Sequence, residues 1–198
     1  MSLRKPDLIS PSQYLAEELA STIKREYLGG VCYAMSGARI RHNRITTSLL
    51  TALGSRLRGR PCEPFNSDTK VRIQLPTHVR FYYPDAMVVC QSNPEGSSFQ
   101  DSPSVVVEVL SRRTRRIDEG EKKDAYLTIP SLVAYLLVEQ ESPDVVVFRR
   151  GEQGFLRQTY EGLEAAIPLP EIGIELSLEE IYERVQFGPE DDEDELEG

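Results

Sequence analysis

The chain has 198 residues, of which 28% are charged and 39% hydrophobic, and its formal net charge is −9. This composition is ordinary for a soluble globular protein with one substantial core. No apolar stretch approaches the roughly 20 residues that a membrane-spanning helix needs, and residues 1–7 lack the apolar core of a signal peptide. We therefore expect a cytoplasmic protein without a membrane segment.

The negative charge is concentrated near the C-terminal end. Residues 190–197 include seven acids and no base, and without them the formal net charge changes from −9 to −2. We predict a single folded domain over residues 1–188 and a disordered acidic tail over residues 189–198, because the tail has almost nothing apolar to bury. An acidic chain is a poor partner for nucleic acid, but the nearly neutral remainder carries local basic clusters, so nucleic acid binding is not excluded.

The first part of the chain predicts two helices separated by a strand. A helix is expected to begin at Ser10-Pro11, because Ser caps a helix and Pro suits its first turn, and Glu26 falls near its end. Residues 31–35 predict a strand, and residues 39–57 carry apolar side chains at helical spacing. His42 in this second helix is open to two interpretations: a ligand or acid–base group, or the commoner packing or hydrogen-bonding residue.

The rest of the chain is richer in strands. The expected strands cover residues 62–65, 68–75, 81–90, 105–110, 133–139, 145–149 and 155–160. Helices are expected over residues 115–128 and 178–185. Strand clusters interleaved with helices indicate an α/β fold with a mixed sheet flanked by helices.

The three cysteines, Cys32, Cys62 and Cys90, are widely spaced and include no CxxC pair. Zinc sites use closely spaced pairs, and disulfide frameworks use even numbers of cysteines. We therefore predict buried thiols in a reducing compartment, rather than metal ligands or disulfides.

Two of the expected strands have a carboxylate inside an otherwise apolar run. Asp85 interrupts the apolar run from Tyr82 to Cys90, and Glu108 interrupts the run from Val105 to Leu110. A carboxylate in a buried strand is costly unless it is paired, hydrogen-bonded or bound to a metal. If the strands are neighbours and their register turns both acids to one face, the oxygens suit Mg²⁺, with water and substrate phosphate as its other ligands.

The helix that follows carries a polar stripe. Asp118, Lys122 and Tyr126 recur at four-residue intervals, which places them on one side of a helix. Taken alone, Asp118 and Lys122 are typical of a surface ion pair. Beside two strand acids, Lys122 could instead reach an attacking water or a phosphate.

The pattern Pro84-Asp85 followed by Glu108-Val109-Leu110 resembles the PD-(D/E)xK nuclease superfamily. A closer resemblance, over about residues 14–155, is to a prokaryotic group of uncharacterised proteins labelled as restriction endonucleases. Its matching segments are residues 26–30, 34–38, 42–45, 57–62, 67–68, 83–85 and 108–111, with Asp118 and Lys122. The resemblance implies a restriction-endonuclease-like core and a metal-dependent endonuclease that hydrolyses nucleic acid, DNA more than RNA.

The resemblance also implies roles for individual residues. Asp85 and Glu108 would hold Mg²⁺ or Mn²⁺, and the Val109 carbonyl would add a ligand. The superfamily lysine is expected two residues after the acid, where this chain has Leu110. The resemblance implies that Lys122 supplies this lysine from the helix.

Further implied roles concern the first helix and a basic run. The superfamily often uses an acid of its first helix near the metal, and Glu26 is the candidate. A basic run with Arg112, Arg113, Arg115 and Arg116 follows the Glu108 strand. These arginines suit phosphate contacts, or they are an ordinary solvated helix start. The resemblance also suggests a homodimer, which would suit cutting of two strands.

Two functions remain open from the sequence. The first is a nuclease, supported by the two acids and the lysine. The second is a catalytically silent nuclease-fold protein that binds nucleic acid or a protein partner, supported by the acidic composition and by the fact that a fold does not determine a function.

Overall fold

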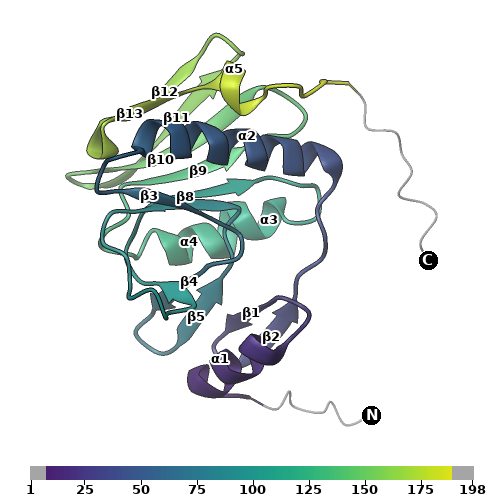
Figure 1. The fold of residues 1–198 in the computed structure, drawn as a ribbon, viewed down its shortest axis with the longest axis vertical. Helices are drawn as coiled ribbons and strands as arrows, with labels where there is room; N and C mark the ends of the chain where they lie inside the picture. Colours follow the sequence, from purple (N-terminus) through teal and green to yellow (C-terminus); the bar gives the residue numbers. More distant parts are fainter. Residues whose placement is uncertain (1–7, 189–198) are drawn as a thin grey trace.

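The structure, a computed structural model, describes residues 8–188, which form three β-sheets and several helices (Figure 1). The six-stranded sheet contains, in spatial order, β11 (Gly154–Glu161), β10 (Asp144–Gly151), β9 (Ala134–Val138), β8 (Pro103–Val109), β6 (Ala86–Val89) and β3 (Glu63–Asn66). The five-stranded sheet contains β2 (Val31–Ala34), β1 (Arg25–Leu28), β5 (Val79–Tyr82), β4 (Lys70–Gln74) and β7 (Phe99–Gln100). The third sheet is the pair β12 (Ala166–Leu169) and β13 (Ile174–Ser177).

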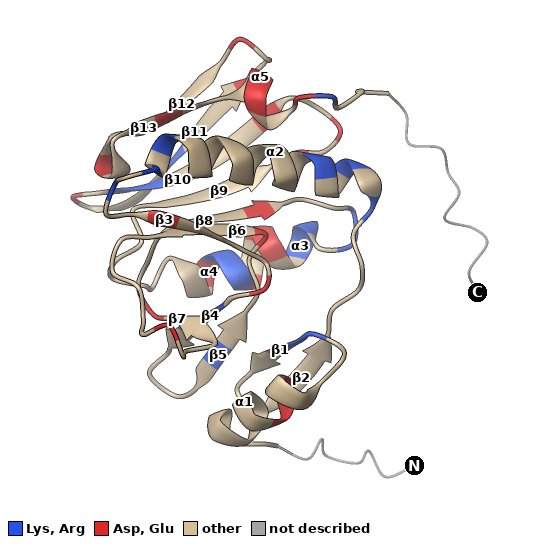
Figure 2. Cartoon of the chain, in the orientation of Figure 1, with Lys and Arg blue, Asp and Glu red and all other residues tan. Residues whose placement is uncertain are grey.

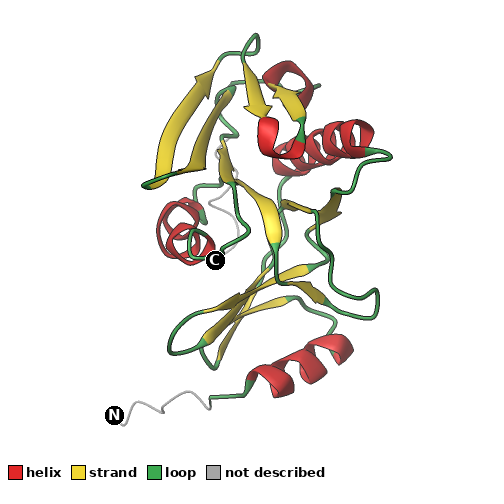
Figure 3. Cartoon of the chain, turned by 90° about the vertical axis from the view of Figure 1, so that its left-hand side faces the viewer, coloured by secondary structure: helices red, strands yellow, loops and turns green. Residues whose placement is uncertain are grey.

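The helices lie on both sides of the strands, as the view in Figure 3 shows. They are α1 (Pro11–Ala20), α2 (Ile40–Leu57), α3 (Arg115–Ile117), the π-helix η1 (Asp118–Lys122), α4 (Lys123–Tyr126), the 3₁₀-helix η2 (Pro170–Ile172) and α5 (Leu178–Ile181). Strand pairs β8–β9 and β4–β7 are parallel, and the other pairs are antiparallel. The predicted α/β fold with mixed sheets flanked by helices is confirmed. The predicted tail, residues 189–198, lies outside the described residues. None of the helices within residues 8–188 is long and apolar enough to cross a membrane.

Helix α2 covers one face of the six-stranded sheet (Figure 1). Its predicted apolar stripe is buried: Ile45, Leu49, Leu53 and Leu57. The stripe packs against alternate residues of β8, including Val105 and Val107. Burying one such side chain contributes about 1.5–3 kcal/mol, so the stripe fixes the helix to the sheet and sets the position of the residues at its N-terminal end.

The other face of the same sheet lies against α4 and the five-stranded sheet. Val106 and Leu110 pack there with Tyr126 of α4 and with Tyr82 of β5. Side chains alternate along a strand, so Glu108, between Val106 and Leu110, points to this second face. The acid that the sequence singles out is therefore enclosed between two sheets and a helix.

Strand β1 replaces the end of the predicted first helix, so the prediction for Glu26 is wrong in this respect. Tyr27 of β1 packs against α1 in an aromatic group with Tyr14 and Phe81. Glu26 precedes Tyr27 in the strand, so its side chain points to the opposite face, toward the six-stranded sheet. The helix ends at Ala20 because the following residues gain strand pairing with β2 and β5, and tertiary pairing overrides the local preference.

The predicted strand over residues 81–90 is two strands, interrupted at Tyr83-Pro84-Asp85. β5 belongs to the five-stranded sheet and β6 to the six-stranded sheet. Pro84 has no N–H for a ladder and restricts the residue before it. The chain therefore crosses from one sheet to the other at Pro84, and Asp85 lies at the crossing.

Two parts of the C-terminal half differ from prediction in detail. The predicted helix over residues 115–128 is present as α3, η1 and α4, with a π-helical turn that the sequence did not predict. Strands β12 and β13 were not predicted, because Pro168, Pro170 and Gly173 favour turns. Ile167 and Leu176 from this hairpin are buried in the core beneath α2.

The prediction of thiols is wrong for Cys62 and Cys90, which form a disulfide. Cys32 is a free cysteine, as predicted, and is half-buried rather than buried. Glu63 pairs with Val89 in the antiparallel ladder of β3 and β6, so the residues just outside this pair come together. Register, rather than spacing along the chain, brings these two cysteines into contact.

Candidate active site

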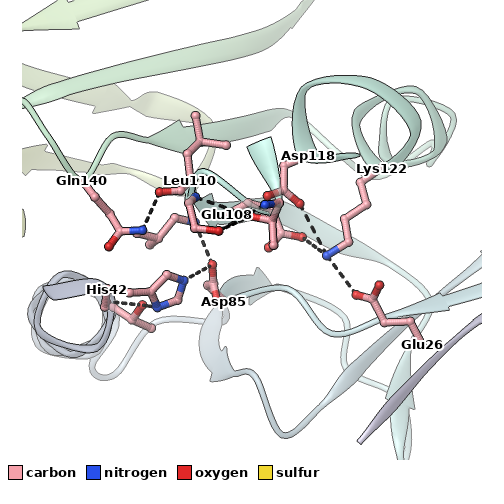
Figure 4. A network of polar contacts seen from close by, with 12 residues as sticks. Glu26, His42, Asp85, Glu108, Leu110, Asp118, Lys122 and Gln140 are labelled. Carbon is pink, nitrogen blue, oxygen red and sulfur yellow. Dashed lines mark hydrogen bonds and ion pairs between the residues drawn. The ribbon is translucent and has the colours of Figure 1, made fainter. Parts of the chain in front are cut away.

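A pocket of about 210 Å³ opens at the end of β8, beside the start of α2 and the start of α3. The acids Asp85, Glu108 and Asp118 line it together with Lys122 and His42. Figure 2 shows acidic and basic segments near one another in this part of the molecule, and Figure 4 shows the side chains. Residues distant in the sequence thus meet at one place.

Asp85 lies next to Glu108 across the sheet. Ala86 pairs with Val107, so extending the antiparallel register by one residue brings Asp85 opposite Glu108. Asp85 Oδ2 accepts hydrogen bonds from the Val109 N–H (2.7 Å) and from His42 Nε2 (3.1 Å). Its other oxygen, Oδ1, accepts none from residues 8–188. The two contacts fix the carboxylate and leave one oxygen for a ligand.

The ammonium of Lys122 lies among three carboxylates, as Figure 4 shows. Its Nζ is 2.9 Å from Glu26 Oε1, 3.4 Å from Glu108 Oε1 and 3.5 Å from Asp118 Oδ1. These four residues are called the Lys122 cluster below. Glu26 comes from β1, Glu108 from β8, and the other two from the π-helix η1, and π-helical turns are frequent at functional sites. The cluster therefore connects the two large sheets.

Burial and crowding change the protonation of this cluster. Burial raises the pKa of Glu108 well above its usual value, and the neighbouring acids add to the effect against the opposing attraction of Lys122. Burial also raises the pKa of Asp118. For Lys122, burial lowers the pKa, but the attraction of Glu108, Glu26 and Asp118 outweighs it, and the net pKa is well above the usual value. One ammonium does not neutralise the acids around it.

The donor set fits a divalent cation. Two buried oxygens of the cluster, Glu26 Oε1 and Asp118 Oδ1, have no polar partner within residues 8–188 other than the Lys122 ammonium that they share. Glu108 Oε1, in contrast, accepts a hydrogen bond from the Tyr126 hydroxyl (3.2 Å). Hard carboxylate oxygens in excess of their counter-charge are the ligands that Mg²⁺ prefers.

The acids do not surround a single position that a metal ion could occupy. In the described part of the chain, no three His, Cys, Asp or Glu side chains are grouped as a ready-made metal site. The Lys122 ammonium lies between three of the acids. A cation would therefore have to bind beside this ammonium, where Asp85 and Glu108 line the pocket.

The backbone of Val109 is part of the site through its N–H, which donates to Asp85. Its carbonyl was the expected metal ligand, and this role remains a prediction. Leu110, which stands where the superfamily has its lysine, is buried, and its carbonyl accepts a hydrogen bond from Gln140 Nε2 (2.5 Å). The position two residues after Glu108 is therefore used for packing, not for charge.

The four predicted phosphate-binding arginines fall into different settings. Arg112, Arg113 and Arg115 line the pocket, whereas Arg116 is exposed and does not. Arg112 pairs with Glu141 at 3.1 Å, and Arg115 pairs with Glu139 at 2.5 Å. Arg113 is exposed and has no ion pair with another residue of the described chain.

Three residues of the site were not assigned to it from the sequence. His42 contacts Asp85, which agrees with its interpretation as a hydrogen-bonding residue. Burial and the Asp85 carboxylate act on its pKa in opposite directions, and the net pKa is raised. Asp118 is buried rather than part of a surface pair, and Tyr126 binds Glu108. The spacing of four residues on either side of Lys122 was the signal that could have assigned Asp118 and Tyr126 to the site.

The sequence and the fold of the chain are similar to those of known proteins. Over 181 residues the chain is 34% identical to the uncharacterized protein slr1290 of Synechocystis, covering 90% of this chain and 94% of that protein. It is 32% identical over 136 residues to the uncharacterized protein sll1609 of Synechocystis, covering 67% of this chain and 76% of that protein. The fold is similar to the crystal structure of a putative nuclease belonging to DUF820 from Anabaena variabilis, with a TM-score of 0.66 and 16% identity over 85% of this chain and 96% of that one.

The family model gives the same result as the resemblance found in the sequence. The model named Uma2, with the description "Putative restriction endonuclease", matches residues 11–179, which include every residue of the Lys122 cluster, Asp85 and His42. The resemblance to a restriction-endonuclease group of the PD-(D/E)xK superfamily is therefore confirmed, and the chain belongs to the Uma2 family.

Proposed function

We propose that the protein is a metal-dependent endonuclease that hydrolyses phosphodiester bonds of nucleic acid in the cytoplasm, with DNA as the preferred substrate. The observation that supports this most is the meeting of Asp85, Glu108 and Lys122 at one pocket in a chain of the Uma2 family. Two acids and a lysine are the chemical groups that such hydrolysis needs.

Asp85 and Glu108 would hold Mg²⁺ or Mn²⁺, with the Val109 carbonyl as a further ligand. When bound, such an ion supplies Lewis-acid activation of water and neutralises negative charge that develops on the phosphoryl group. The raised pKa of Glu108 supports this proposal. A nearby cation offsets the burial and repulsion that otherwise favour the protonated acid.

The remaining residues have positioning and electrostatic roles. Lys122 keeps its proton at neutral pH, because its pKa is raised by the surrounding acids. It therefore acts as an electrostatic donor to the reacting phosphate rather than as a general base. Glu26 contacts the ammonium from the opposite sheet and orients it. His42 and the Val109 N–H hold Asp85 through Oδ2.

Arginines at the pocket would contact the phosphate backbone. Arg113 is the strongest candidate, because Arg112 and Arg115 are engaged by acids. Arg113→Ala should weaken nucleic acid binding. It should also make the negative slope of the log of the association constant against log salt shallower by about 0.9, the value for one phosphate contact. Arg116→Ala removes the same charge outside the pocket and should change the slope less. Equal slopes for the two variants would remove Arg113 from the proposed interface.

The test of the function is a cleavage assay with the full chain. Supercoiled DNA, linear duplex DNA and single-stranded RNA are incubated with Mg²⁺, Mn²⁺ or EDTA. We expect DNA cleavage with either metal and none with EDTA. Asp85→Asn and Glu108→Gln should abolish it, whereas Asp124→Asn should not, because Asp124 is 76% exposed and its ion pair within residues 8–188 is with Lys123.

The same assay separates the alternatives. Faster cleavage of RNA would contradict the preference for DNA. Binding of nucleic acid without cleavage under every metal condition would instead identify a silent nuclease-fold binding protein. Cleavage that survives Asp85→Asn would contradict the assignment of the site.

A further inference from the structure

The outer edge of β11 differs from the other edges of the two large sheets. These edges are β3 in the six-stranded sheet and β2 and β7 in the five-stranded sheet. β7 has two residues, β2 has four, and β3 contains Pro64. β11 has eight residues and contains neither proline nor lysine. Edge strands are usually short, interrupted or charged, which prevents pairing with other chains. β11 largely lacks this protection.

The outward backbone groups of β11 have no partner within residues 8–188. β10 and β11 are joined by the two residues Glu152-Gln153, and Gly151 lies opposite Gly154. In such a hairpin the closing pair exchanges backbone hydrogen bonds, and bonded and non-bonded pairs alternate from there. The odd-numbered residues of β11 therefore direct their N–H and C=O groups to the open edge. No backbone hydrogen bond from a loop of the described chain reaches residues 155–161.

The side chains of these odd-numbered residues have a self-complementary charge pattern. Arg157, Thr159 and Glu161 are all exposed. In an antiparallel pair of two β11 strands centred on Thr159, each Arg157 lies opposite Glu161 of the other copy. A pair centred on Arg157 or on Glu161 would instead place like charges opposite one another. A pair centred on Gln158 would leave both charges without an opposite partner. Opposite charges stabilise cross-strand pairs, and like charges destabilise them.

We propose that the protein forms a homodimer in which β11 pairs antiparallel with β11 of a second copy about a twofold axis at Thr159. The two six-stranded sheets then form one continuous sheet. Leu156, which is 64% exposed in the single chain, lies diagonal to Tyr160 of the second copy on the same face. The interface does not include the pocket at the end of β8, so the dimer and the proposed nuclease activity can fail independently.

The first test measures mass in solution with charge variants. Sedimentation of the full chain over a concentration series should show a dimer. Arg157→Glu and Glu161→Arg should each raise the dimer Kd by about tenfold or more, because each creates two like-charge pairs. The double variant with both substitutions should restore the Kd of the parent dimer. Far-UV circular dichroism of each variant checks the fold. A monomer at every concentration, or a dimer that neither single variant weakens, would overturn the proposal.

The second test measures the register by cross-linking. In a chain that carries Cys32→Ser, Thr159→Cys should form an intermolecular disulfide on oxidation. Cα atoms of a hydrogen-bonded antiparallel pair are about 5.5 Å apart, which is within the range of disulfides. Gln158→Cys is the control, because its copies would be too far apart to bridge. Cross-linking of Gln158→Cys instead of Thr159→Cys would overturn the register.

Discussion

Two buried groups of charged side chains lie near the crossing from β5 to β6, and they differ in how well their charges are matched. The first, the Glu18 network, consists of Glu18, Arg25, Lys70 and Tyr83. Glu18 Oε1 accepts hydrogen bonds from the Arg25 N–H (2.7 Å) and the Tyr83 hydroxyl (3.0 Å), and Oε2 accepts one from Arg25 Nε (3.0 Å). Lys70 Nζ donates to the Tyr83 hydroxyl (3.1 Å). Both oxygens of this buried acid have donors.

In the Lys122 cluster, by contrast, the acids outnumber their donors. Three acids share one ammonium, and two of their buried oxygens have no other polar partner in the described chain. Burial lowers the pKa of Lys70 in the first group, whereas the acids raise the pKa of Lys122 in the second. A satisfied buried network stabilises one structure, and an unsatisfied one costs free energy. Such conflicts are expected at functional sites, so the first group holds α1 to the sheet and the second is suited to bind a cation.

The largest expected effect is that of removing the ammonium. Lys122→Met should lower cleavage by about 10²–10³-fold, as for other preorganised donors. Because Lys122 is buried among three acids, the change should also lower the free energy of unfolding by about 3–5 kcal/mol. Turnover and urea unfolding of the same preparation measure both effects.

The control for this variant is the next residue. Lys123 lies 5.5 Å from the centre of the Phe148 ring and is outside the cluster. Lys123→Met should keep cleavage near that of the parent. If Lys123→Met is the inactive variant, or if Lys122→Met cuts as well as the parent, the assignment of the lysine is wrong.

Metal binding should distinguish the two groups without any measurement of activity. An ion that binds only the folded chain stabilises it by about 2.7 kcal/mol at 100 times its Kd. Mn²⁺ should therefore raise the Tm of the parent and of Glu18→Gln, but not that of Asp85→Asn. The measurement is thermal unfolding over a series of metal concentrations. An equal rise in Asp85→Asn would show that the ion binds elsewhere.

Two matched substitutions should change stability in opposite directions. Glu18→Gln weakens bonds to the charged Arg25 and should destabilise the protein by about 1.5–3 kcal/mol. Glu108→Gln removes one acid from the crowded Lys122 cluster and keeps an oxygen for Tyr126. It should stabilise the metal-free protein by about 1 kcal/mol, the size of a typical single-substitution effect. Urea unfolding of both variants tests the comparison. Destabilisation by Glu108→Gln would mean that Lys122 already compensates this acid.

The sequence predicted the parts of this site that depend on local patterns. The stripe of α2 and the apolar run of β8 are visible in consecutive residues, and the cost of a buried carboxylate identified Asp85 and Glu108. The position of Glu26 was predicted wrongly because it depends on pairing of β1 with β5, far along the chain. The Cys62–Cys90 disulfide depends in the same way on the register of β3 and β6. The burial of Asp118 depends on a π-helical turn, for which the residue spacing gives no signal.

The smallest expected effect is on the pH dependence of stability. The pKa of Glu108 in the folded chain is raised well above 4.5, and that of Asp118 is raised above 3.8. Between the ordinary and the raised values the folded chain binds more protons than the unfolded chain. The free energy of unfolding therefore falls as pH rises through this window. Lys122 acts in another window, because its raised pKa stabilises the fold below 10.5 and this contribution is lost as pH rises further.

The difference between the parent and Glu108→Gln isolates the acid. In metal-free buffer the parent should lose stability relative to Glu108→Gln as pH rises from about 4.5, by at most about 1.4 kcal/mol per pH unit for one proton. The difference should become constant above the raised pKa of Glu108. Asp124→Asn, which removes an exposed acid of α4, should follow the curve of the parent. A Glu108→Gln curve parallel to that of the parent would mean that the Glu108 carboxylate stays ionised at no cost in stability. The contrast between the Glu18 network and the Lys122 cluster would then rest on Asp118 alone.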